Sequence, residues 1–198
     1  MLTPIVSIII RTHNQKSLLS RAIDSVLNQT TMRWELLIID DGSDDGTESF
    51  LKKYFLINKR IRYFKRSYNG EVPSLNFGIK NAVGNYITFL KPQDEFLSNH
   101  IEVRLNFLEE NPEVDLVTGG INLEKLKLEQ PDYFQKIQSS DEKESILSNL
   151  VLFGRRKVFE LLSGFNDVEF YETDFVVRAL DHFNIKKVDF PTYIIHLD

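Results

Sequence analysis

The sequence contains no cysteine, which excludes disulfide bonds, thiolate nucleophiles and zinc sites with cysteine ligands. It also lacks a basic surplus: 24 Lys and Arg against 29 Asp and Glu give a net charge of -5, which disfavours a nucleic-acid partner. No apolar run is long enough to span a bilayer. The apolar run at 5–10 has no basic leader or small-residue cleavage site, so we expect a cytoplasmic protein without a targeting segment.

Glycine is missing where two common nucleotide sites require it. The apolar run at 6–10 is followed by Arg11-Thr12-His13-Asn14, without the glycines of a dinucleotide fingerprint or a P-loop. A classical NAD site and an ATPase are therefore disfavoured. The polar side chains can contact a base or ribose, or they can form a loop in which Asn14 caps the next helix. Both interpretations are open for Thr12, and the cap is favoured for Asn14.

Strands and helices alternate along the first part of the chain. With 198 residues, of which 42% are hydrophobic, the chain can bury one core. Continuous apolar, β-branched runs are typical of strands buried on both faces of a parallel sheet. The alternation predicts right-handed βαβ units and an α/β, mostly parallel sheet flanked by helices. The predicted strands lie at 6–10, 34–39, 61–64, 86–90 and 114–118.

The second part of the chain has weaker patterns. Residues 124–144 are rich in Lys, Glu and Gln and have little periodicity, and we place no domain boundary there. Apolar residues predict strands at 151–153 and 193–195, and helices at 157–162 and 173–183.

An acidic turn, Asp40 to Thr47, follows the second predicted strand. Ligands of open α/β sheets bind beyond the carboxyl ends of the strands, so this turn indicates a binding site. It is not an EF-hand loop, because counting from Asp41 the twelfth position is Lys52 instead of glutamate.

Helix capping explains only part of this turn. Asp44 or Thr47 can cap the next helix, which leaves Asp40 and Asp41 unexplained because an unpaired buried carboxylate is costly. A carboxylate that accepts the imide N–H of a uracil, or an exocyclic amine, would explain one of them.

Several ordered motifs together resemble the family 2 glycosyltransferases of the GT-A fold. The likeness is close over about the first 120 residues, in the segments Val6–Asn14, Ala22–Thr30, Trp34–Thr47, Arg60–Phe64, Asn76–Ile79 and Ala82–Leu90. The resemblance implies one GT-A-like, Rossmann-like domain over residues 1–198. Residues 1–118 would form the nucleotide-sugar-binding half and residues 119–198 the acceptor-side half.

The resemblance assigns a set of residues to the nucleotide sugar. Thr12 and His13 fall where the family has a Thr-Tyr pair, and Asp41 falls on the aspartate that holds the base. Arg11 and Leu75 depart from the family, which commonly has proline and arginine there. The complete set implied for the donor is Thr12, His13, Asp41, Asn76 and Lys91.

The largest departure lies where the family has its Asp-x-Asp metal motif. Lys91 and Gln93 occupy the usual aspartate positions, and Asp94 keeps a carboxylate. Three interpretations are open: Gln93, Asp94 and His196 hold Mn²⁺ or Mg²⁺ weakly, Lys91 replaces the metal at the diphosphate, or transfer is lost.

A second catalytic segment of the family falls on 164–178. Glu172 takes the place of the aspartate that acts as general base in inverting members, and its alternative role is a carboxylate at a helix N-terminus. Asp174 and Arg178 are spaced for an ion pair within the helix. His100 and His182 are interpreted as ordinary helix-face residues.

The resemblance implies an enzyme that transfers a sugar from a UDP- or GDP-linked donor to a sugar, lipid or protein acceptor, with inversion. Its role would be cell-wall or polysaccharide biosynthesis. The alternative is a degenerate relative that binds a nucleotide sugar or a partner without transfer. A nucleotidyltransferase is a third interpretation, which requires a glycine-rich basic loop that Arg11 to Lys16 does not supply.

Overall fold

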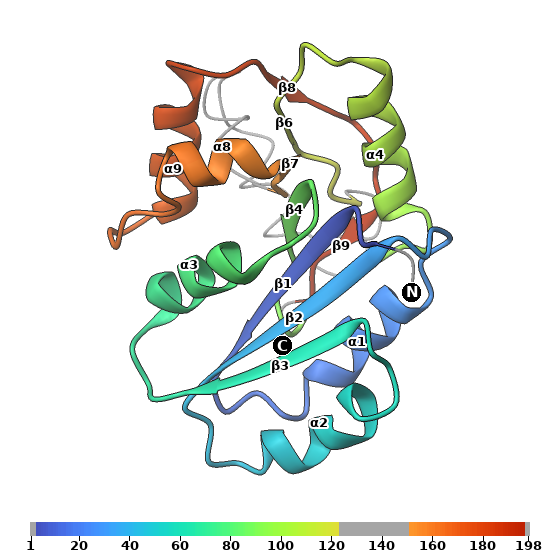
Figure 1. Ribbon diagram of the computed structural model, residues 1–198, viewed down its shortest axis with the longest axis vertical. Coiled ribbons are helices and arrows are strands. Elements are labelled where there is room, and N and C mark those ends of the chain that lie inside the picture. The colour runs from blue at the N-terminus through green and yellow to red at the C-terminus, as the bar shows by residue number, and fades with distance from the viewer. Residues whose placement is uncertain (1–2, 123–150, 197–198) are drawn as a thin grey trace.

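The strands form one large and one small sheet. The computed structural model describes residues 3–122 and 151–196. The strands are β1 (Val6–Thr12), β2 (Trp34–Asp41), β3 (Ile61–Arg66), β4 (Tyr86–Phe89), β5 (Glu95–Phe96), β6 (Leu116–Thr118), β7 (Phe153–Arg155), β8 (Ile185–Lys187) and β9 (Tyr193–Ile194). Seven of them make a central sheet in the order β3-β2-β1-β4-β7-β6-β8, and β5 pairs with β9 in the small sheet (Figure 1).

The central sheet is mostly parallel, as the sequence predicts. Strand β1 pairs in parallel with β2 and β4, β2 pairs in parallel with β3, and β6 pairs in parallel with β8. Strand β7 is antiparallel to both of its neighbours, β4 and β6. The sequence patterns did not predict β5 or β8. Residues 124–144, whose sequence has little periodicity, lie outside the described residues.

Helices cover both faces of the sheet (Figure 1). They are α1 (Leu19–Leu27), α2 (Thr47–Phe55), α3 (Glu71–Asn81), α4 (His100–Glu110), α8 (Arg156–Leu161) and α9 (Tyr171–Leu180). One cluster of buried side chains joins the sheet to α1, α2 and α4, and a second joins it to α3, α8 and α9. In the described part of the chain, no helix combines the length and the apolar composition that crossing a membrane requires.

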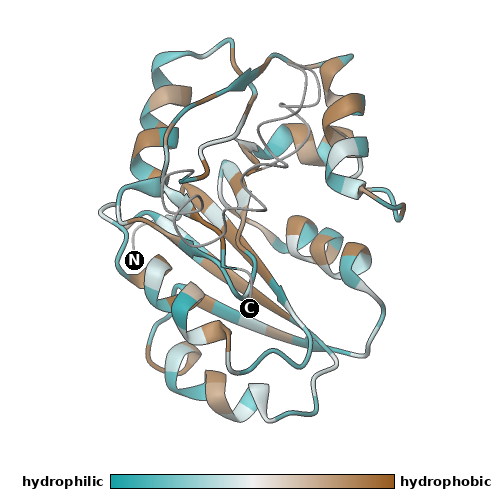
Figure 2. Cartoon of the chain, turned by 180° about the vertical axis from the view of Figure 1, so that it is seen from behind, coloured by the Kyte–Doolittle hydropathy of each residue, from teal (hydrophilic) through white to brown (hydrophobic). Residues whose placement is uncertain are grey.

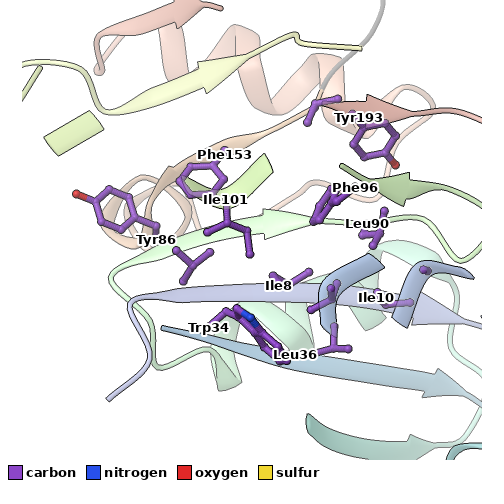
Figure 3. Packing of buried hydrophobic residues seen from close by; sticks show 14 of the residues in the cluster. Ile8, Ile10, Trp34, Leu36, Tyr86, Leu90, Phe96, Ile101, Phe153 and Tyr193 are labelled. Carbon is purple, nitrogen blue, oxygen red and sulfur yellow. The ribbon is translucent and has the colours of Figure 1, made fainter. Parts of the chain in front are cut away.

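The inner strands are apolar at consecutive positions because both of their faces are buried. In β1, Ile8 and Ile10 belong to the first cluster and Ile9 to the second, since successive side chains of a strand point to opposite faces. Leu36 and Leu37 divide in the same way on β2. Figure 3 shows Ile8, Ile10 and Leu36 in the first cluster, and Figure 2 shows hydrophobic residues concentrated along the central strands.

A buried arginine attaches the last part of the chain to α4. Arg104 is fully buried and donates hydrogen bonds to Thr192 Oγ1 at 2.6 Å and to the Gly119 carbonyl at 3.0 Å. Burial lowers the pKa of Arg104 to about 9. His100 is also fully buried and stacks on Phe96 with ring centroids 3.7 Å apart, so its interpretation as an ordinary helix-face residue is wrong. These contacts hold β9 beside β5, at the edge where the candidate site lies.

Candidate active site

Polar side chains gather at the carboxyl ends of the central parallel strands. Thr12 ends β1 in register with Asp40 of β2, and Lys91 follows β4, which is the other neighbour of β1. Because parallel strands end at the same edge of a sheet, the predicted donor residues Thr12, Asp41 and Lys91 share one edge.

Both aspartates of the acidic turn are buried, and both have partners. Asp40 accepts a hydrogen bond from the Ser43 amide at 2.8 Å and one from the Tyr63 hydroxyl at 2.5 Å. Asp41 accepts one from the Asn69 amide at 2.9 Å and pairs with the Arg11 guanidinium at 2.8 Å. Burial raises the pKa of the Asp41 carboxyl, but the hydrogen bonds from Arg11 and Asn69 outweigh it, so the net pKa is lowered. Asp41 is therefore ionised at neutral pH.

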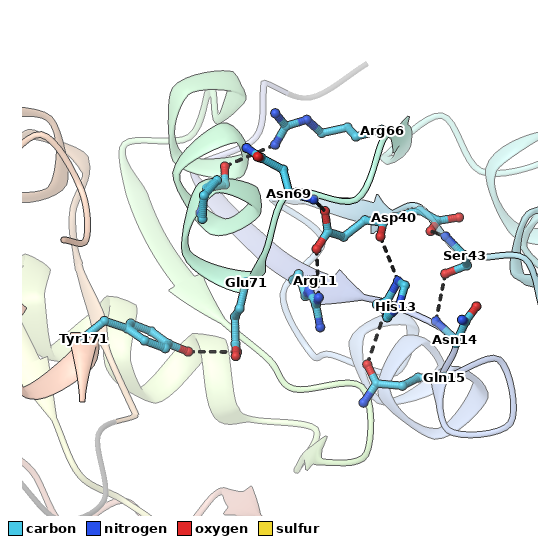
Figure 4. Close-up of polar contacts among 12 residues, drawn as sticks. Arg11, His13, Asn14, Gln15, Asp40, Ser43, Arg66, Asn69, Glu71 and Tyr171 are labelled. Carbon is cyan, nitrogen blue, oxygen red and sulfur yellow. Dashed lines mark hydrogen bonds and ion pairs between the residues drawn. The ribbon is translucent and has the colours of Figure 1, made fainter. Parts of the chain in front are cut away.

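The loop after β1 packs on the acidic turn instead of capping a helix. His13 Nδ1 lies 2.8 Å from the Asp41 carbonyl oxygen, and the Asn14 amide donates to Ser43 Oγ at 2.9 Å (Figure 4). The predicted Asn14 cap is wrong, because Leu18 precedes α1 and makes no side-chain cap bond. The Thr12 hydroxyl is buried without a hydrogen-bond partner among the described residues.

The predicted caps of α2 are also wrong. Gly46 precedes that helix and has no side chain, while Asp45 accepts hydrogen bonds from both the amide and the hydroxyl of Thr47. Asp45 thus offers the same carboxylate chemistry as the predicted cap Asp44, from the next position in the chain. The local sequence could not decide among several adjacent capping residues.

A small pocket of about 40 Å³ brings together charged residues from both parts of the chain. Lys91 and Glu172 both line it, together with Arg11, Glu71 and Tyr171. Tyr171 donates a hydrogen bond to the Glu71 carboxylate at 2.9 Å (Figure 4). Burial raises the pKa of the Glu172 carboxyl, with a further increase from Glu71 and a partial offset from Lys91. A carboxyl group with a raised pKa, next to a cation in a pocket, is suited to accept a proton.

The predicted metal ligands are not arranged as a metal site. Asp94 is 2% exposed, and its two oxygens accept hydrogen bonds from the Tyr193 hydroxyl at 2.7 Å and the His196 amide at 2.9 Å. The His196 ring lies 3.3 Å from Glu95, and the backbone carbonyl of Gln93 accepts from Arg21. Within residues 3–122 and 151–196, no group of three His, Asp or Glu side chains is placed to hold a metal ion. The donor set as arranged does not fit a divalent cation.

Asn76 is not among the residues that line the Glu172 pocket, and it connects α3 to the segment before α9. Its amide group donates to the Phe165 carbonyl and accepts from the Phe165 amide, both at 2.8 Å. Arg178 supports the same segment: it pairs with Asp174 at 2.8 Å, which confirms the predicted ion pair, and it donates to the Gly164 carbonyl. These contacts fix the position of the helix that carries Glu172.

The sequence did not indicate a role for Glu71, Tyr171 or Tyr193 in the candidate site. Glu71 and Tyr171 lie far apart in the chain and meet only in the folded structure, as do Tyr193 and Asp94. The one local signal was Arg11, which stands where the resembling family has proline.

Comparison with known sequences identifies glycosyltransferases as relatives over most of the chain. The model of "Glycosyl transferase family 2" matches residues 7–162. An uncharacterised glycosyltransferase of Rickettsia felis is 42% identical over 137 residues, which cover 68% of this chain and 21% of that protein. A putative teichuronic acid biosynthesis glycosyltransferase, TuaG of Bacillus subtilis, is 32% identical over 108 residues, which cover 54% of this chain and 43% of that protein. The chain thus spans less than half the length of these relatives.

Solved structures share the fold at low sequence identity. The mannosyltransferase PcManGT from Pyrobaculum calidifontis, in complex with GDP-Man and Mn²⁺, superposes with a TM-score of 0.77 at 16% identity, covering 98% of this chain and 57% of that one. S. aureus TarS 1–349 in complex with UDP-GlcNAc superposes with a TM-score of 0.75 at 18% identity, covering 98% of this chain and 58% of that one. The predicted GT-A-like architecture is therefore confirmed.

Proposed function

Because the chain belongs to glycosyl transferase family 2, we propose that it transfers a sugar from a nucleotide-diphosphate sugar to an acceptor hydroxyl, with inversion at the anomeric carbon. The observation that carries this proposal is the pocket in which Lys91 and Glu172 meet at the carboxyl edge of the sheet. A base and a cation that meet at one reacting centre are groups that an inverting displacement can use.

In this proposal Glu172 is the general base. Its carboxylate takes the proton of the acceptor hydroxyl while that oxygen attacks the anomeric carbon and the bond to the nucleotide diphosphate breaks. Burial raises the pKa of Glu172, which strengthens it as a proton acceptor relative to an exposed carboxylate. Lys91 supplies positive charge to the departing diphosphate, and no step is assigned to a metal ion because the donor set does not fit one.

The nucleotide would lie over the ends of β1 and β2. There, Asp41 would face the base once its fully buried carboxylate parts from Arg11, and Thr12 has a buried hydroxyl without a partner to offer. The neighbours solved with GDP-Man and with UDP-GlcNAc support a GDP- or UDP-linked donor. Residues 1–118 would bind this donor and residues 119–198 would form the acceptor side.

The description of one relative, TuaG, supports a class of acceptor. TuaG is described as a putative teichuronic acid biosynthesis glycosyltransferase, which favours an acceptor in cell-wall or polysaccharide biosynthesis.

A second candidate function is binding of a nucleotide sugar or a partner without transfer. The state of Asp94 favours it, because a carboxylate with both oxygens engaged is poorly placed to hold a catalytic cation. The retained Glu172 next to Lys91 favours transfer.

Calorimetric titration with UDP and GDP, each with and without Mn²⁺, tests donor binding and the role of Lys91. Binding of either nucleotide that does not depend on Mn²⁺ is the expected result. Binding only in the presence of Mn²⁺ would contradict the role of Lys91, and no binding to either nucleotide would contradict donor binding altogether. A Lys91→Met variant is expected to lose affinity for the diphosphate, whereas Lys80→Met, which removes an exposed lysine of α3 outside this pocket, is the matched control.

A further inference from the structure

A second pocket lies at the opposite edge of the sheet, where the parallel strands begin. Its volume is about 520 Å³, within the usual range for small-molecule sites. Pro4 precedes β1, Trp34 begins β2, Arg60 precedes β3, and Val83 lies ahead of β4, and all four residues line the pocket. Since these strands are parallel neighbours, this edge is remote from Lys91, which follows the other end of β4.

The pocket has an apolar lining that is open to solvent. Pro4, Met32 and Val83 contribute accessible apolar surface, and Met32 and Val83 are 53% and 52% exposed. The Trp34 side chain itself is buried in the first core cluster, so it forms a fixed wall (Figure 3). Such a surface gains free energy when an apolar ligand removes it from water.

The charges around this lining are not balanced. Arg62 is paired with Glu35 at 2.8 Å, and Glu35 also accepts hydrogen bonds from the Ser7 hydroxyl and the Val83 amide, so its charge is compensated. Lys59 and Arg60, in contrast, have no acidic partner in the part of the chain that the structure describes. Two positive charges therefore remain beside the pocket.

Arg60 is held in place without neutralisation. Its guanidinium lies over the Trp34 ring, 3.7 Å from the centroid, and it donates to the Met32 carbonyl at 3.3 Å. Burial lowers the pKa of Arg60, which reflects a charged group that has lost part of its hydration. An anion placed next to this pre-organised guanidinium would form charge-assisted hydrogen bonds at little entropic cost.

We propose that this pocket binds a small molecule that joins an apolar body to an anionic group, such as an alkyl or aryl phosphate. The apolar body would lie against Pro4, Met32 and Val83, and the anion would pair with Arg60 and Lys59. The site is independent of the proposed transfer reaction, because none of its residues lines the Glu172 pocket.

The protein carries its own reporter for this site, because Trp34 is its one tryptophan. Titration with octyl phosphate, kept below its micellar concentration, is expected to change the Trp34 fluorescence saturably, with a calorimetric titration giving the same affinity. 1-Octanol and inorganic phosphate each supply half of the recognition and are expected to bind at least about tenfold more weakly. Absence of saturable octyl phosphate binding by calorimetry would overturn the proposal, and so would equal affinity for 1-octanol.

Two charge-removing variants test the anion contact. Arg60→Met and Lys59→Met keep an apolar stem, and each is expected to weaken octyl phosphate binding by calorimetry, with a loss of about tenfold for Arg60→Met. Lys80→Met removes the same charge outside the pocket and is expected to leave the affinity unchanged. Since Lys59 is exposed, its variant is expected to fold normally even if Arg60→Met does not. Unchanged affinity in the folded variants would overturn the proposal.

Discussion

Removal of the Tyr193 hydroxyl tests how firmly Asp94 is engaged. In the Tyr193→Phe variant, the buried Asp94 carboxylate loses the hydrogen bond of 2.7 Å and keeps only the one from the His196 amide at 2.9 Å. A hydrogen bond to a charged group contributes about 1.5–3 kcal/mol, against about 0.5–1.5 kcal/mol for a neutral pair. We therefore expect the free energy of unfolding to fall by about 1.5–3 kcal/mol at about pH 8, where Asp94 is ionised.

The size of this loss should depend on pH. Burial raises the pKa of folded Asp94 above the unfolded value of 3.8, and Tyr193 opposes that shift. The folded state therefore binds more protons than the unfolded chain between these two pKa values, and Asp94 reduces stability as pH rises through that window. Removing the hydroxyl raises the folded pKa further, so the loss in Tyr193→Phe is expected to shrink as pH falls into that window.

Urea unfolding followed by circular dichroism across this pH range measures the effect. Tyr68→Phe is the matched control, because Tyr68 is 65% exposed and its stability change is expected to stay within about 0.5 kcal/mol. A loss below about 0.5 kcal/mol in Tyr193→Phe at every pH would refute the reasoning. Asp94 would then not be tied to Tyr193, and its carboxylate would be available to a cation.

Three further substitutions test the donor site, the base and the loop before α9. Glu172→Gln is expected to lower the transfer rate about 10²–10⁴-fold and to spare donor affinity. Because the pKa of Glu172 is raised above 4.5, the wild-type rate should increase with pH through a value above 4.5, and normal turnover of the variant would remove Glu172 as the base. Asp41→Asn is expected to weaken UDP or GDP binding in calorimetry, and an unchanged affinity would remove Asp41 from the base site. Gly164→Ala would place a Cβ 2.2 Å from Asn76 Oδ1 at a φ of +75°, so urea unfolding should show a loss of at least about 2 kcal/mol, and unchanged stability would contradict the described contact.

Local sequence patterns were sufficient to predict the parallel part of the sheet and the edge that carries the candidate site. Apolar runs such as 6–10 and 34–39 can only be buried on both faces, and that pattern is local in the chain. The acidic turn after the second run marked the carboxyl edge for the same reason. The residues that cap α1 and α2 were less predictable. The predicted caps were misplaced by one or more residues, because several adjacent side chains offer the same chemistry.

The hydrogen-bond partners of the carboxylates depend on tertiary contacts. Antiparallel β7 enters the sheet between β4 and β6, and this long-range pairing leaves no periodic signal in the local sequence. The docking of β9 on β5 brings Tyr193 to Asp94 and engages a carboxylate that local sequence presents as a ligand. Likewise, Glu172 acquires its raised pKa only when the packing of α9 buries its carboxyl group, with a further increase from Glu71. Sequence specifies which chemical groups are present and which faces are buried, whereas partners, charge balance and solvent access depend on contacts between residues distant in the chain.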